Sequence, residues 1–324
     1  MLYLFGQIIR IEGERVNRVF SSNKYKALLA SFCALGWSVA YPLIKIGYSE
    51  FQILPDDLGG KVLFAGVRFF IAGLLIIAFC HIRKTPINIK NKNDYYWIFL
   101  LGFVNTTLHY MFAYIGLGYN SGARSTILDS LGSFLLIILS ALFLPDDKIN
   151  FKKAIGCILG FFGIILATIQ PNDNIFENIT FLGDGMILLN AIFAALGGII
   201  TRIVSKKMNI MPATGISMAL GGGVMIIFSV FIGLKSRLIF NVKGLIILLI
   251  LILISAVCFA IYNELLSYYP ISEISIFNAL IPVLGVFFSA ILLKEEIKWQ
   301  YICAVIIVAI GIIFVNYKPK ITAT

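Results

Sequence analysis

Long, predominantly apolar runs are the feature that most restricts the fold of this chain. A helix needs about 20 apolar residues to cross the hydrocarbon core of a bilayer. The chain contains ten runs of about that length, at approximately residues 25–47, 62–81, 95–118, 122–144, 151–170, 182–204, 212–234, 244–268, 272–293 and 299–317. The connections between them are short. The sequence therefore predicts an all-α membrane protein with ten transmembrane helices and almost no extramembrane domain.

The charge content agrees with this interpretation. Lys, Arg, Asp and Glu make up 13% of the 324 residues, about half of the ~25% in a soluble domain. That composition excludes a soluble enzyme, a nucleic-acid binder and a disordered chain. We therefore expect a lipid bilayer and a small-molecule substrate as partners, with no nucleic acid, and either a monomer or a homodimer. The five cysteines show no CxxC spacing, and we expect neither a metal site nor a cofactor.

The distribution of basic residues predicts the orientation in the membrane. With the N-terminus in the cytoplasm, 17 of the 26 Lys and Arg residues belong to the cytoplasmic side and 8 to the other side, while Arg68 lies within a span. Cytoplasmic loops carry the excess of positive charge. The sequence thus predicts a multi-pass protein of the plasma or inner membrane with both termini inside. Residues 1–24 would form a cytoplasmic, amphipathic N-terminal segment, and residues 318–324 a cytoplasmic tail.

The two halves of the chain resemble each other. Displaced by 149 residues, the segment 64–79 aligns with 213–228, and Ser140-Ala141-Leu142 aligns with Ser289-Ala290-Ile291. Residues 25–170 and 182–317 would then be two repeats of five spans each. Because five is odd, the repeats must have opposite orientations, as in many transporters with a substrate site between the halves. The repeat predicts a central cavity.

These motifs resemble those of the drug/metabolite transporter superfamily, in particular its EamA-type members. The resemblance rests on Phe64-Ala65-Gly66-Val67-Arg68-Phe69-Phe70-Ile71-Ala72-Gly73, on Ala279-Leu280-Ile281-Pro282-Val283, on Ser289-Ala290-Ile291-Leu292-Leu293-Lys294-Glu295-Glu296 and on Gly311. It covers about residues 25–317. It implies a ten-helix exporter with a central cavity that works by alternating access.

Polar side chains recur on one face of the fourth and the ninth spans. These faces hold Thr126, Asp129 and Ser133 and, 149 residues later, Ser275, Asn278 and Pro282. Pro282 has no N–H for the carbonyl of Asn278, which leaves that carbonyl free. We interpret the two faces as walls of the substrate cavity. The alternative is that they are hydrogen-bonding contacts between helices.

Further polar and aromatic residues lie within other spans. Asn105 and His109 share one face of the third span, and Asn263 and Glu264 lie in the eighth. His109 and Glu264 are candidates for a proton or cation site. The alternatives are that His109 is a neutral hydrogen-bonding residue, which is the more common case for a lone histidine in a bundle, and that Glu264 reaches the interface from the cytoplasmic end of its span. Trp37 and Tyr41 would form an apolar cavity wall or simply pack. Arg68 would form a structural ion pair with Asp129, which lies at a similar depth.

The pattern as a whole predicts a secondary transporter. With the resemblance, it favours an exporter of small organic metabolites such as amino acids. The alternative within transport is a multidrug efflux carrier for lipophilic cations. A membrane-embedded enzyme is a remote alternative, because it would need clustered His, Asp or Glu side chains and the chain has 2 histidines. We therefore expect no catalytic residues.

Overall fold

The computed structural model of the protein describes residues 20–143, 151–168, 179–236, 238–269 and 271–316. Within these ranges every regular element is a helix. The described residues contain 7 helices that are long and apolar enough to cross a membrane, at Tyr25–Glu50, Leu58–Ile82, Lys92–Tyr119, Gly122–Phe143, Phe181–Lys207, Ile210–Ile232 and Val242–Tyr268. Shorter apolar helices cover Ala154–Gly163, Leu280–Leu293 and Trp299–Gly311. Most of the predicted N-terminal segment and the whole C-terminal tail lie outside the described residues.

The helices follow the order of the predicted spans. In the first half they are α2 (Asn23–Glu50), α3 (Leu58–Ile82), α4 (Lys92–Gly102), α5 (His109–Tyr119), α6 (Gly122–Asp129), α7 (Leu131–Phe143) and α8 (Phe151–Thr168). In the second half they are α9 (Met186–Lys207), α10 (Ile210–Ile232), α11 (Val242–Tyr268), α12 (Ile271–Ser275), α13 (Leu280–Leu293) and α14 (Trp299–Asn316). Each predicted apolar run coincides with one helix or with two consecutive helices.

Capping side chains outside the apolar runs set several of the helix starts. The Asp57 carboxylate accepts a hydrogen bond from the backbone N–H of Gly60 at 2.7 Å, so α3 begins at Leu58 rather than at residue 62. The Asn241 side chain accepts from Gly244 N–H at 2.7 Å in the same way at the start of α11. Such caps satisfy backbone donors that the first helical turn leaves unpaired.

Three predicted spans depart from regular α-helix along their length, which the apolar pattern did not indicate. α4 passes into α5 through a π-helical segment, Phe103–Leu108. α6 ends at Asp129, and α7 starts after a turn at Ser130. α12 passes into α13 through a 3₁₀ segment, Ile276–Ala279. Interrupted helices at membrane depth are tolerated where they are buried in protein or line a cavity.

Local chemistry accounts for two of these interruptions. Both the N–H and the hydroxyl of Ser130 bond to the carbonyl of Ile127, at 3.2 Å and 2.5 Å. This i to i−3 pattern tightens the chain at the end of α6. In the ninth span, Pro282 removes the donor for the carbonyl of Asn278. The fourth and ninth spans are thus interrupted at Asp129 and Asn278, the pair that the 149-residue displacement aligns.

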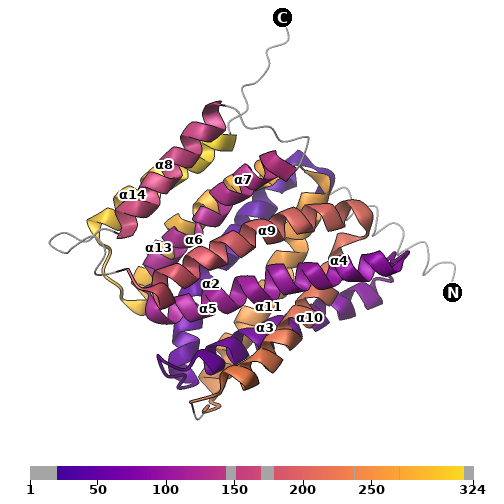
Figure 1. Ribbon diagram of the computed structural model, residues 1–324, viewed down its shortest axis with the longest axis horizontal. Helices are drawn as coiled ribbons and strands as arrows, with labels where there is room; N and C mark the ends of the chain where they lie inside the picture. The colour runs from indigo at the N-terminus through magenta and orange to yellow at the C-terminus, as the bar shows by residue number, and fades with distance from the viewer. Residues whose placement is uncertain (1–19, 144–150, 169–178, 237, 270, 317–324) are drawn as a thin grey trace, which may run out of the picture.

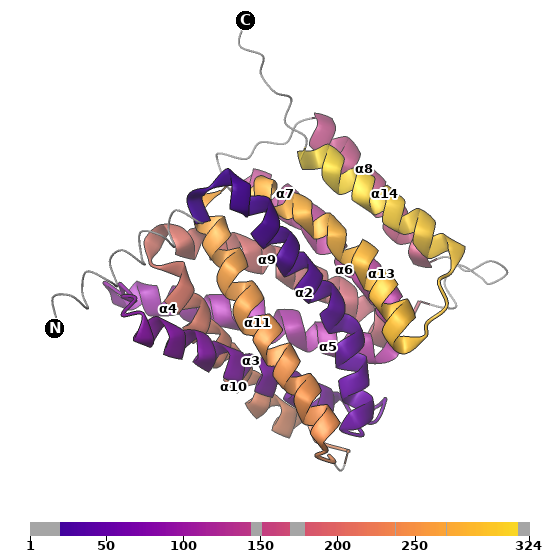
Figure 2. The same ribbon diagram turned by 180° about the vertical axis from the view of Figure 1, so that it is seen from behind.

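The most extensive helix contacts are those of α3 with α10 and of α8 with α14, and each pair lies side by side in both views (Figures 1 and 2). Glycines allow this close approach. A Cβ atom at Gly222 would collide with the backbone of Phe70, and one at Gly311 would lie 2.7 Å from the carbonyl oxygen of Gly156. Small residues permit backbone contact between membrane helices.

Two central helices organise the rest of the molecule. α2 packs against α11 and α13, and α9 packs against α5 and α7. Figure 2 shows α2, α11 and α13 in front, whereas Figure 1, from the opposite side, shows α9 and α5 in front. Likewise α3 packs against α11, and α10 packs against α4. The central cavity lies between α2 and its neighbours α11 and α13 on one side, and α9 and its neighbours α5 and α7 on the other.

Candidate functional site

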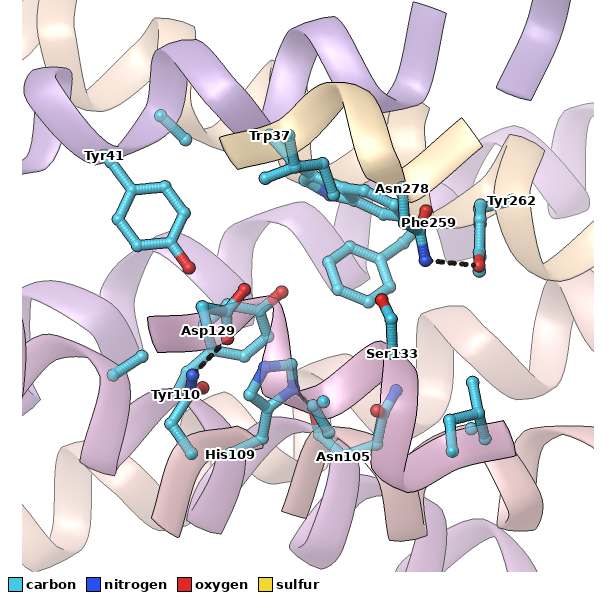
Figure 3. A pocket seen from close by; sticks show the side chains of 18 of the residues that line it. Trp37, Tyr41, Asn105, His109, Tyr110, Asp129, Ser133, Phe259, Tyr262 and Asn278 are labelled. Atoms are coloured by element: carbon cyan, nitrogen blue, oxygen red, sulfur yellow. Dashed lines mark hydrogen bonds between the residues drawn. The ribbon is translucent and has the colours of Figure 1, made fainter. Parts of the chain in front are cut away.

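A cavity of about 170 Å³ lies at the centre of the helix bundle (Figure 3). The interrupted third, fourth and ninth spans contribute to its wall, together with α2, α3, α9 and α11. The residues predicted for the substrate cavity that line it are Trp37, Tyr41, Asn105, His109, Asp129, Ser133, Asn263 and Asn278. They come from both halves of the chain, so only the folded structure brings them together.

Asp129 lies at the C-terminal end of α6, where the fourth span is interrupted. Its carboxylate accepts a hydrogen bond from the Asn190 side-chain amide of α9. The Tyr41 hydroxyl of α2 is directed at the same carboxylate (Figure 3). Three elements that are far apart in the sequence therefore hold one acidic group at the cavity wall. A carboxylate at a mainly apolar cavity wall requires such polar partners, because an isolated one is strongly disfavoured in an apolar environment.

The predicted ion pair between Arg68 and Asp129 is not formed, because Arg68 has other partners. Its Nε donates to the carbonyl oxygen of Leu251 at 3.1 Å and to the Ser255 hydroxyl at 2.7 Å. Its Nη1 donates to the Tyr114 hydroxyl at 2.8 Å. In the part of the chain that the structure describes, no Lys or Arg forms a salt bridge with Asp129. The prediction was based on the similar depth of the two residues in the membrane. Depth does not determine the direction of a side chain, and Arg68 of α3 is directed toward α11.

Asn105 and His109 lie at the π-helical segment of the third span. The Nδ1 atom of His109 is 3.2 Å from the carbonyl oxygen of Asn105, and its ring stacks on Tyr110 with centroids 4.1 Å apart. A Cβ atom at Gly197 of α9 would collide with the Asn105 side chain. The glycine thus lets Asn105 approach α9 closely. Both predicted residues face the cavity, and a proton-carrying role for His109 stays a prediction.

The ninth span closes the opposite wall. Asn278, in the 3₁₀ segment, donates from its side-chain amide to the Tyr262 hydroxyl at 3.1 Å. The Trp37 ring meets Tyr262 and Phe259 edge-on, with centroids 4.9 Å and 5.6 Å away. This end of the cavity is therefore mainly aromatic, with one amide beside it (Figure 3).

Three residues of the predicted polar faces do not line the cavity. Thr126 donates to the carbonyl of Ala123 at 2.9 Å and packs on α13, where a Cβ atom at Gly285 would lie 2.5 Å from its methyl group. Ser275 and Pro282 are buried in the ninth span away from the cavity wall. For these three, the alternative of helix contacts describes the observed position. Residues at helical spacing cover a face of the helix that is wider than the strip in contact with a small cavity.

Glu264 is also outside the central cavity, although its neighbour Asn263 lines it. Glu264 borders a separate surface depression at the end of α11, together with Lys90, Lys206 and Lys207. Adjacent residues on a helix point about 100° apart. For this reason Asn263 faces the central cavity, whereas Glu264 faces the surface depression.

Several cavity residues were not among the predicted site residues. Among them are the polar and aromatic residues Tyr110, Tyr114, Asn190, Phe259 and Tyr262. Asn190 is a polar residue within the sixth span, and this was the signal in the sequence that could have indicated it. The aromatic residues carry no such signal, because a chain with 14% aromatic residues offers many equivalent candidates.

A basic residue is bonded to the end of a neighbouring helix at each end of the cavity. Lys45, next to the cavity residue Ile44, donates to the carbonyl oxygen of Asn120 at 2.5 Å, and its Nζ is 4.0 Å from the Glu295 carboxylate. Glu295 also accepts from the N–H groups of Gly122 and Ala123, at the start of α6. The contact thus ties α2 to α5, α6 and the end of the ninth span.

Arg202 makes the corresponding contact on α9. Next to the cavity residue Thr201, its Nη1 donates to the carbonyl oxygens of Leu266 and Tyr269, at 2.5 Å and 3.5 Å. Tyr269 lies against Lys26 near the start of α2, whereas Lys45 lies near its end, ~28 Å along the helix. The two contacts are therefore at opposite ends of the cavity.

Comparison with known proteins places the chain among transporters. The sequence model of the EamA-like transporter family matches residues 24–169 and 181–317. An uncharacterized transporter, YvbV of Bacillus subtilis, is 24% identical over 91% of this chain and 92% of its own length. A chloroplastic WAT1-related protein of Arabidopsis thaliana is 27% identical over 87% of this chain and 67% of its own. A solved crystal structure superposes with a TM-score of 0.67 at 14% identity, covering 90% of this chain and 96% of the other.

Proposed function

Because the chain belongs to the EamA-like transporter family, we propose that it is a secondary transporter that exports small organic metabolites by alternating access. Family membership indicates a multi-pass membrane protein and a transporter rather than an enzyme. The proposal adds the class of solute, the direction and the mechanism. Amino acids are among the solutes that it covers.

One observation carries the proposal. The central cavity is bordered by polar side chains at the two points where the fourth and ninth spans are interrupted, Asp129 and Asn278. Interrupted helices that place polar groups near the middle of the membrane are typical of substrate sites in secondary transporters. The volume of about 170 Å³ favours a small solute, since drug-sized ligands occupy pockets of roughly 300–1,000 Å³.

An arrangement of two inverted repeats, 25–170 and 182–317, belongs to this proposal. It is supported by the family match, which covers two successive segments with nearly these bounds. It is also supported by the packing, because α2 contacts α11 and α13 while its counterpart α9 contacts α5 and α7. Alternating access would then follow from opposite movements of equivalent helices on either side of the cavity.

Transport assays with cavity variants test the function. Metabolite profiling of the medium from cells with and without the protein would first identify exported solutes. In reconstituted vesicles, we expect Asp129→Ala and Asn278→Ala each to reduce transport of such a solute by about tenfold or more, because each removes a polar group at the cavity wall. Thr126→Ala, which alters a helix contact outside the cavity, is the matched control. Normal transport by both cavity variants at normal protein yield would contradict the proposal.

A second candidate is a multidrug efflux carrier for lipophilic cations. It is favoured by one observation, an acidic group directed into a cavity with the aromatic side chains of Trp37, Tyr41 and Phe259. Glu264 does not contribute to it, because that residue lies outside the cavity. Susceptibility assays with quaternary ammonium dyes separate the two candidates. Export of bulky dyes at rates like those of small metabolites would favour the multidrug carrier.

A further inference from the structure

In the described part of the chain, no cation is among the partners of the Asp129 carboxyl group. Asn190 and Tyr41, the two groups at its carboxylate, are both neutral donors. Arg68 of the cavity wall is bonded to α11 and to Tyr114 instead. His109, the other basic side chain of the wall, has its Nδ1 atom 3.2 Å from the carbonyl oxygen of Asn105. Placing an anion in a low-dielectric environment is costly unless an opposite charge is near. A ligand that supplies a positive charge would remove that cost.

A polar atom beside Asp129 lacks a partner. Asn190 is 1% exposed and lines the cavity. Its side-chain nitrogen donates to Asp129, but its side-chain oxygen is buried and accepts no hydrogen bond. An unsatisfied buried acceptor costs free energy comparable to a lost hydrogen bond. The missing group at this position is therefore a hydrogen-bond donor.

Aromatic rings complete the surroundings of these two acceptors. Tyr41 and Tyr110 lie near Asp129 in the cavity wall (Figure 3). Phe259 meets the Tyr110 ring edge-on, with centroids 5.9 Å apart. Ring faces attract organic cations, and the effect is larger in a site from which water is excluded. Trp37 and Tyr262 extend the apolar wall away from the acceptors.

We infer that Asp129 and Asn190 form a subsite for a protonated amine attached to a small apolar body. An alkylammonium group has up to three donors. It can bond to the Asp129 carboxylate and to the free side-chain oxygen of Asn190 while its carbon chain lies against the aromatic wall. This inference rests on the proposed transport function, since it assigns the substrate class of the same cavity.

Binding to the purified full-length protein in detergent tests the subsite without a transport assay. The probes are phenethylamine, 2-phenylethanol and 3-phenylpropionate, which are similar in size and differ in charge. Titration calorimetry should show that phenethylamine binds about tenfold or more tightly than the other two, because a charged group buried with its partner contributes that much to affinity. Methylammonium would extend the series to a cation without an apolar body.

Variants assign the binding to the two acceptors. We expect Asp129→Asn and Asn190→Leu each to weaken phenethylamine binding about tenfold or more, and Asp129→Glu to retain it in part. Glu264→Gln, which removes a carboxylate outside the cavity, should leave it unchanged. If Asp129→Asn fails to fold, Asn190→Leu and Asp129→Glu still report on the site.

The inference is overturned if no ammonium probe binds, if the neutral or anionic probe binds as tightly, or if Asp129→Asn and Asn190→Leu bind phenethylamine normally. Amine binding by a protein that transports nothing in vesicles would support the subsite and contradict the proposed function. The two failures are thus distinguishable.

Discussion

Arg68 and Asp129 bring opposite charges to the same cavity, and each is held by a different set of neutral partners. Arg68 is 2% exposed and donates to three acceptors on two helices, whereas Asp129 accepts from Asn190. The partners therefore decide the role of each residue. Arg68 joins α3, α5 and α11, and Asp129 is the group that we propose for ligand binding.

We expect Arg68→Lys to destabilise the protein although it keeps the charge. A lysine ammonium cannot reproduce the planar fork of donors that reaches Leu251, Ser255 and Tyr114 together, so buried acceptors would be left unpaired. The free energy of unfolding in detergent should fall by about 2–4 kcal/mol, measured as a loss of thermal stability. Arg83→Lys, at the end of the same helix, is the matched control. Equal stability of the two variants would show that the fork is not required.

At the scale of elements, the helix ends on either side of the cavity are joined by equivalent contacts. Lys45 of α2 bonds to the C-cap residue of α5, Asn120, and Arg202 of α9 bonds to the C-cap residue of α11, Tyr269. Cations interact favourably with the free carbonyl groups at helix C-termini. In a transporter that opens alternately, one of these contacts would have to break at each step.

Substitution of these two residues should therefore open the cavity from opposite sides. In a cysteine-free background, Ala194→Cys places a thiol at the cavity wall. Lys45→Gln should raise the reactivity of this thiol toward a membrane-impermeant reagent about tenfold from one side of the membrane. Arg202→Gln should raise it from the other side. The reason is that each substitution removes a hydrogen bond from a charged group. Labelling rates in right-side-out and inside-out vesicles measure this.

Conservative variants separate gating from general loosening of the fold. Lys45→Arg and Arg202→Lys should keep low reactivity, and Lys207→Gln, close to Arg202 in sequence, should have no effect. Increased labelling from the same side in both Gln variants would contradict the gating role.

At the scale of the whole molecule, the alternation of helices places the polar loops at two opposite ends. Asn93 is exposed at the start of α4, and Glu296 is exposed after the end of α13. Glu295 contacts the start of α6, which follows the far end of α5. Asn93 and Glu296 are thus at opposite ends of the bundle.

The basic residues predict which end faces the cytoplasm. We expect Asn93→Cys to be labelled by an impermeant reagent from the cytoplasmic side, and Glu296→Cys from the external side, because the excess of Lys and Arg belongs to the end with Asn93. Intact cells and inside-out vesicles provide the two conditions. Labelling of both cysteines from one side would contradict the predicted topology.

The apolar runs by themselves determined that this is a helical membrane protein, because about 20 consecutive apolar residues have few other stable environments. The family motifs indicated a transporter, which the family match confirms. The spacing of polar residues also indicated part of the cavity wall, including Asp129 and Asn278, since polar groups in a span face the bundle interior.

Only the tertiary structure decided which polar groups meet. It placed Arg68 with α11 rather than with Asp129, and Glu264 outside the cavity. It also brought Asn190 from the sixth span to the interruption of the fourth. The physical reason is that hydrophobicity sets the depth of a helix in the membrane, while its rotation and its neighbours are set by packing between helices. Small residues such as Gly197 fix that packing, and they look alike in every span.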